Sequence, residues 1–175
     1  LAHGHVTWLI RQGLKFIFYP CVPYERNEFP DAGNHYNCPI VTSYAENIKN
    51  NIDELHGGDI DFFNPFLSFE SEKILEEALI REFGEHCRIP AEEIAAAAKK
   101  AWKEQENVRE DIKRKGEETL KYMEETGHRG IVLAGRPYHI DPEINHGIPE
   151  LINSYGIAVL TEDSISHLHG VGRPL

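Results

Sequence analysis

The sequence predicts an α/β protein in which a long charged helix joins two lobes built on parallel sheets. Four short apolar runs have the composition of buried strands, at residues 14–19, 60–63, 130–134 and 157–160. Segments with the apolar spacing of helices separate these runs, and strands that alternate with helices favour parallel sheets. We therefore expect a first lobe over residues 1–85, a connecting helix over 86–127 and the start of a second lobe over 128–175.

In the first lobe, a helix should end near residue 12, just before the first strand. Ser43 and Glu46 have the spacing of a capping box, which predicts that the next helix starts there. After the second strand, Ser68 or Ser71 can cap a further helix, and Gly84 is expected to end it.

The connecting helix is predicted to run from Pro90, at a first-turn position, to about Thr126. Most of its surface carries charged residues at i,i+4 spacing, which is typical of a solvated face. Its narrow apolar stripe consists of Ile94, Ala98, Ala101, Gln105, Val108, Ile112, Gly116, Leu120 and Met123. A helix of this kind is more often a strut than a functional site. The second lobe then has a buried strand at residues 130–134, a helix over 144–155 and a strand at 157–160.

Composition excludes several classes of protein. The 175 residues carry a formal net charge of −11, which argues against a nucleic-acid-binding surface. No apolar run reaches the roughly 18 to 20 residues of a membrane-spanning helix. Three scattered cysteines are too few for a secreted disulfide scaffold, so we expect a cytoplasmic protein.

Cys21 and Cys38 stand at two junctions between loops and regular elements. Cys21 follows the first strand after Pro20, and Cys38 precedes Pro39 before a helix. The carboxyl edge of a parallel sheet is where ligands bind. The spacing of the two cysteines matches no zinc knuckle, and an iron–sulfur cluster normally needs three or four thiolates. The spacing alone therefore leaves two interpretations open, a pair of cluster ligands or two small buried apolar residues.

A second polar constellation lies at residues 135–147, between a strand and a helix. A glycine-containing loop at a helix start can bind an anion, and Arg136 could supply a bidentate positive charge. The loop is not a P-loop, because no Gly-Lys-Ser/Thr follows. Ordinary turn formation by Asp141, Pro142 and Asn145 is the alternative interpretation.

Four segments resemble, in order and spacing, the iron–sulfur proteins related to 2-hydroxyglutaryl-CoA dehydratase, in the branch of CoA-substrate-specific enzyme activases. They are Ala2–Val6, Phe18–Tyr24, His35–Val41 and Gly135–Pro142. The resemblance implies Rossmann-like lobes around a cubane 4Fe-4S cluster, with Cys21 and Cys38 among its metal ligands. It implies electron transfer or reductive activation of a CoA-thioester-like substrate, bound by Arg136, Tyr138, His139, Asn145 and His146.

The resemblance also implies partners. The family pattern has a further cysteine shortly before the matched Ala2–Val6 segment, an ATPase activator domain and a later α/β lobe. We therefore expect this chain to be a fragment that lacks the ATPase domain and is inactive alone, from an oligomeric parent that is a dehydratase or an ATP-dependent reductase component. Two alternatives stay open: a cluster-free module that binds phosphate, a nucleotide or CoA, and a domain that docks a subunit through its acidic helix.

Overall fold

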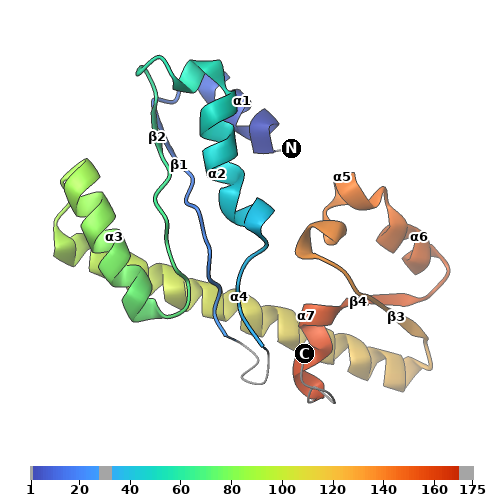
Figure 1. Cartoon of the computed structure of the whole chain (residues 1–175). Helices are drawn as coiled ribbons and strands as arrows, with labels where there is room; N and C mark the ends of the chain where they lie inside the picture. Colours follow the sequence, from blue (N-terminus) through green and yellow to red (C-terminus); the bar gives the residue numbers. More distant parts are fainter. Residues whose placement is uncertain (1, 28–32, 170–175) are drawn as a thin grey trace. The chain divides into compact units, whose positions relative to one another are not determined.

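The computed structural model describes residues 2–27 and 33–169 and shows a mixed α/β protein (Figure 1). The described residues pack as two units, one up to Trp102 and one that begins at Lys103. The boundary falls inside the long helix α4 (Ala91–Thr126), which contributes residues to both units. The division at residues 85 and 127 remains a prediction from the sequence pattern.

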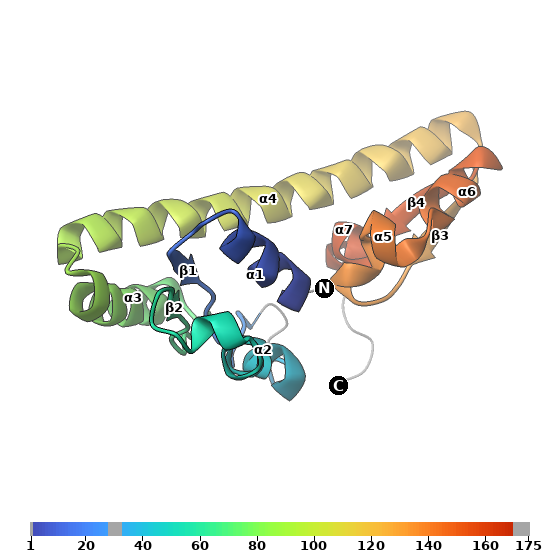
Figure 2. The same cartoon turned by 90° about the horizontal axis from the view of Figure 1, so that it is seen from above.

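The first unit is built on two parallel strands, β1 (Phe16–Phe18) and β2 (Asp61–Phe63), in the register Phe16↔Asp61. Helices α1 (Ala2–Arg11) and α2 (Pro39–Asn51) lie on one face of the pair, and α3 (Glu72–Cys87) lies on the other (Figure 1, Figure 2). A 3₁₀ turn, Asp53–Leu55, leads from α2 toward β2. This arrangement confirms the predicted parallel α/β unit.

Alternation along the strands fills both faces of this pair. Ile17 and Phe62 join a core with the helices α1 and α2, which contribute Val6, Ala45 and Ile48. Phe16, Phe18 and Phe63 point to the other face, where their rings contact Phe83 and His86 of α3.

Two predicted helix ends are wrong, for local reasons. Helix α2 begins at Pro39, whose fixed φ suits the first helical position, and Ser43 lies inside the helix with its hydroxyl donating to the Ile40 carbonyl. Helix α3 begins as predicted, since the Ser71 hydroxyl accepts from the Ile74 amide. It runs through Gly84, however, and ends at Cys87.

Helix α4 starts directly after Pro90, as predicted. Its exposed face carries ion pairs between residues three or four apart, for example Lys113–Glu110 and Arg114–Asp111. The residue that follows Ile94 and Ala98 into the core is Trp102, whereas the sequence pattern assigned this position to Ala101. The predicted stripe members Gln105 and Val108 are exposed as well. No helix among the described residues has both the length and the apolar character needed to cross a membrane.

The second unit contains the parallel strands β3 (Gly130–Leu133) and β4 (Ala158–Thr161), in the register Gly130↔Ala158. A 3₁₀ turn, Pro137–Ile140, and the helices α5 (Pro142–Asn145) and α6 (Ile148–Ser154) connect them, and α7 (Glu162–Ile165) with a 3₁₀ turn at Ser166–Leu168 follows β4.

Two expectations for this unit are corrected. The single helix predicted over residues 144–155 is split, because His146 and Gly147 adopt left-handed backbone conformations. Strand β3 is not buried, since Ile131 and Val132 are 42% and 45% exposed. Because each described sheet has two strands, the Rossmann-like character of the lobes remains a prediction.

Helix α7 packs against α4 at one glycine. A Cβ atom at Gly116 would lie 2.2 Å from the backbone oxygen of Ser164. The backbones can approach this closely only because glycine has no side chain. Nearby, His167 Nε2 lies 2.8 Å from a carboxylate oxygen of Glu117.

Candidate functional site

In the first unit, both predicted thiol ligands lie where a loop joins a regular element. Cys21 extends the direction of β1, and a parallel bridge links it to Phe66, just beyond β2. Cys38 is the residue immediately before α2. Cys21 is therefore at the carboxyl end of the parallel pair, where α/β proteins bind ligands.

The loop between the cysteines closes on itself. Tyr24 and Tyr36 form an antiparallel bridge, and their rings lie 5.1 Å apart between centroids. At the base, the side-chain amide of Asn37 donates to the Val22 carbonyl at 2.9 Å. Val22 and Asn37 are the chain neighbours of Cys21 and Cys38. The structure therefore brings the two cysteines to the base of the same loop.

The Cys21 side chain is fully buried, at 0% exposure, within the apolar core below α1 and α2. This burial raises the pKa of the Cys21 thiol above its ordinary value, because desolvation disfavours the thiolate. The Glu46 carboxylate adds to the increase, while the backbone N–H of Glu46 and the Lys49 ammonium oppose it. A free Cys21 is therefore held as the neutral thiol.

A partly buried hydrogen-bond network of Asn64, Glu46 and Lys49 supports this end of the sheet. Asn64, which directly follows β2, is 9% exposed. Its amide donates to a carboxylate oxygen of Glu46 at 2.5 Å, and its carbonyl oxygen accepts from Lys49 at 3.0 Å. These bonds join α2 to the carboxyl end of β2. These three residues were not predicted as a group from the sequence. The pattern that could have indicated them is the polar pair Asn64-Pro65 directly after a predicted strand.

Cys38 has a different environment. Its side chain is exposed, and it occupies the N-cap position of α2 without capping the helix through its sulfur. The amino-terminal end of a helix dipole favours negatively charged groups. The third cysteine, Cys87, ends α3 on the opposite face of the β1–β2 pair. Only Cys21 and Cys38 share a loop.

An iron–sulfur cluster needs several thiolate ligands close together. Thiolate sulfur is the ligand that such clusters take, and two thiols at one loop base fit this chemistry as a pair. Over residues 2–27 and 33–169, no group of three or more His, Cys, Asp or Glu side chains is placed to hold a metal ion. The described residues thus provide two candidate thiol ligands, fewer than the three or four thiolates that a cluster normally needs.

In the second unit, the predicted polar loop borders a hollow at the carboxyl ends of β3 and β4. Arg136 and His139 both line it. The Arg136 backbone N–H donates to His139 Nδ1 at 2.8 Å, so the neutral ring carries its proton on Nε2. The His139 ring fits at this position because residue 135 is a glycine; a Cβ atom at Gly135 would lie 2.5 Å from His139 Nδ1. The Arg136 guanidinium forms no hydrogen bond or ion pair with another described residue, and Arg136 is exposed.

The other predicted residues of this loop, Tyr138, Asn145 and His146, lie outside the hollow. The Tyr138 ring packs edge-on against His139, with centroids 4.6 Å apart, and is 55% exposed. Asn145 is buried and supports the loop, because its amide donates to the Ile140 carbonyl and its oxygen accepts from the Gly147 N–H. His146 is exposed in a left-handed conformation. None of these three residues lines the hollow.

Three lining residues were not predicted from the sequence. Thr161, Glu162 and Asp163 close the hollow from the end of β4, and the Thr161 hydroxyl donates to the Asp163 carboxylate. Their signal was a polar run directly after a predicted strand. The lining thus carries one guanidinium group and two carboxylates, which could contact an anionic group and a hydrogen-bond-donating group of a ligand respectively.

Comparison with known proteins assigns the family of this chain. The family model described as the CoA enzyme activase uncharacterised domain matches residues 1–165. The chain belongs to this family. Neither the curated proteins nor the solved structures contain a match.

As a CoA enzyme activase domain, the chain is linked to the activation of CoA-related enzymes and hence to a partner enzyme. The match covers both the cysteine loop and the Arg136 loop. In this activase domain, the two groups of predicted site residues belong to different packing units.

Proposed function

We propose that this CoA enzyme activase domain contributes Cys21 and Cys38 as thiolate ligands to an iron–sulfur cluster of the 4Fe-4S type, in electron transfer or reductive activation of a CoA-thioester-like substrate. The observation that supports it most is the hydrogen bond between Val22 and Asn37, which holds the neighbouring cysteines at one loop base. This loop base stands beside the carboxyl end of the β1–β2 pair, where α/β proteins bind ligands.

The two thiols would have different tasks. When bound, the cluster would supply one-electron chemistry. Cys21 would lose its proton on ligation, and its apolar surroundings would exclude water from that side. Cys38 is exposed and lies at a helix amino terminus, so it would be the accessible ligand. The remaining ligands and the ATPase activator would come from outside the described residues, for example from a partner.

The test is anaerobic reconstitution with iron and sulfide, on this chain and on a version extended at both ends. We expect Cys21→Ser and Cys38→Ser each to remove most of the bound iron, sulfide and EPR signal from the protein that forms a cluster. Cys87→Ser is the matched control and should keep them, because this thiol lies on the other face of the sheet. Full iron content in the Cys21→Ser, Cys38→Ser double variant, or no cluster in either protein, would show the proposal to be wrong.

We further propose that the Arg136 loop binds the anionic part of the substrate, with His139 beside it and Tyr138 and His146 at its exposed rim. Asn145 would hold the loop in shape. The support is the Arg136 guanidinium, which has no partner among the described residues and whose five N–H donors suit a phosphate or carboxylate.

This second proposal is tested with coenzyme A by calorimetry. A hydrogen bond to a charged group contributes about 1.5–3 kcal/mol, so Arg136→Gln should raise Kd at least about tenfold. Arg129→Gln removes the same charge outside the hollow and should leave Kd unchanged. Affinity that survives Cys21→Ser and Cys38→Ser would support a binding role independent of any cluster. Equal weakening by both arginine variants would contradict a specific site.

A further inference from the structure

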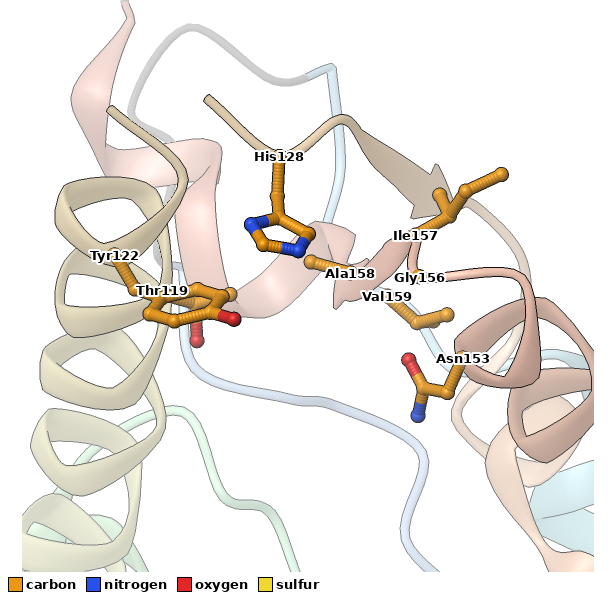
Figure 3. Close-up of a pocket in the computed structure, with 8 residues that line it drawn as sticks. All are labelled: Thr119, Tyr122, His128, Asn153, Gly156, Ile157, Ala158 and Val159. Atoms are coloured by element: carbon orange, nitrogen blue, oxygen red, sulfur yellow. The ribbon is translucent and has the colours of Figure 1, made fainter. Parts of the chain in front are cut away.

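A second hollow lies in the Lys103–Arg173 unit, at the end of the β3–β4 pair opposite to the Arg136 loop (Figure 3). It has a volume of about 310 Å³, near the lower limit of small-molecule sites, which span about 300–1,000 Å³. One ring system would fill it. The lining consists of Thr119, Tyr122, His128, Asn153, Gly156, Ile157, Ala158 and Val159.

A chain of hydrogen bonds sets the orientation of His128. The Thr126 hydroxyl donates its single proton to the Tyr122 carbonyl at 2.6 Å. Its oxygen must therefore accept from His128 Nδ1, which lies 2.7 Å away. In the neutral ring, Nε2 is then left as an acceptor. Figure 3 shows this nitrogen directed into the hollow, and no other described residue bonds to it.

Aromatic and amide groups complete the lining. The Tyr122 ring stacks against His128, with centroids 5.4 Å apart and planes 24° apart. The Asn153 side chain lies across the hollow from Tyr122 (Figure 3). Neither the Tyr122 hydroxyl nor the Asn153 amide has a hydrogen-bond partner among residues 2–27 and 33–169. The strand residues Ile157 and Val159 supply an apolar side.

These groups define the chemistry of a ligand. The lining contains no carboxylate, ammonium or guanidinium group, so it suits an uncharged ligand. An aromatic surface favours a planar ring, and an asparagine amide can pair with an adjacent donor and acceptor, as it does on an adenine edge. We propose that this hollow binds a planar, uncharged nitrogen heterocycle of the nucleobase type. It is independent of both proposals above.

The test uses adenosine as the probe, with the 175-residue chain followed by NMR. We expect saturable shifts of the His128 imidazole and of the Gly156–Val159 amides. Tyr122→Leu, which removes the stacking surface, should raise Kd about tenfold. His128→Phe keeps a ring but removes the Nε2 acceptor, and we expect a similar increase. Tyr155→Leu is the matched control, because this tyrosine is 74% exposed and does not line the hollow.

Several results would overturn the inference: no saturable binding of adenosine, shifts confined to other residues, or equal weakening by Tyr155→Leu and Tyr122→Leu. Circular dichroism shows whether each variant is folded. If Tyr122→Leu does not fold, His128→Phe still tests the site. Arg136→Gln, Cys21→Ser and Cys38→Ser should all bind adenosine like the unaltered chain, which separates this site from the proposed function. If coenzyme A displaces adenosine, the natural ligand is the base of CoA. If adenosine stays bound in the presence of coenzyme A, the natural ligand is a free nucleoside. Both results support the site.

Discussion

Phe63→Ala is expected to lower the free energy of unfolding of the first unit by about 3–5 kcal/mol, the usual cost of removing a buried aromatic ring. Phe63 is 8% exposed and joins β2 to α3. Its ring stacks on His86 at 4.2 Å and meets Phe83 edge-on at 5.0 Å. Alanine would leave a cavity between the sheet and this helix. Urea unfolding followed by tryptophan fluorescence measures the effect, because both tryptophans, Trp8 and Trp102, lie in this unit.

Phe66→Ala is the matched control for this substitution. Phe66 lies three residues further along, is 57% exposed, and contributes to the Cys21 bridge through its backbone. We expect its replacement to change the free energy of unfolding by no more than about 0.5 kcal/mol. Similar losses for Phe63→Ala and Phe66→Ala would mean that the packing between β2 and α3 is not as described.

Gly116→Ala is expected to destabilise the second unit by roughly 2 kcal/mol. Alanine favours a helix interior over glycine by about 1 kcal/mol, which alone would stabilise α4. Here, however, the new Cβ would lie 2.2 Å from the Ser164 backbone oxygen, so α7 must move away. Overpacking of this kind costs about 1–3 kcal/mol, and a backbone atom cannot turn aside as a side chain can. Amide hydrogen exchange should become faster in α7 and its capping residue Thr161.

Gly84→Ala provides the opposite case within α3. A Cβ at Gly84 would have its nearest neighbour, the Ile89 oxygen, at 4.0 Å, which is an ordinary contact. The helix propensity then dominates, and we expect a gain of about 0.5–1 kcal/mol in the free energy of unfolding of the first unit. Destabilisation by Gly84→Ala, or stabilisation by Gly116→Ala, would contradict these two environments.

Local sequence patterns predicted most of the elements and fewer of their ends. The four strands, the start of α3 at Ser71 and the start of α4 after Pro90 follow from composition and capping residues within a few positions. The predicted end at Gly84 is wrong because Arg88 takes up the left-handed conformation that a glycine would usually supply at a helix end.

The candidate sites show the same division between local and long-range information. The sequence by itself determined the α/β class, the position of Cys21 after a strand and of Cys38 before a helix, and the polar Arg136 loop. Only the tertiary structure decided that Val22 accepts a hydrogen bond from Asn37. The same holds for the hydrogen-bond network of Lys49, Asn64 and Glu46. It also holds for the hollow that His128 and Asn153 border. The reason is physical. Strand, helix and cap preferences depend on neighbouring residues, whereas these contacts join residues 15 or more positions apart and depend on strand register and helix packing.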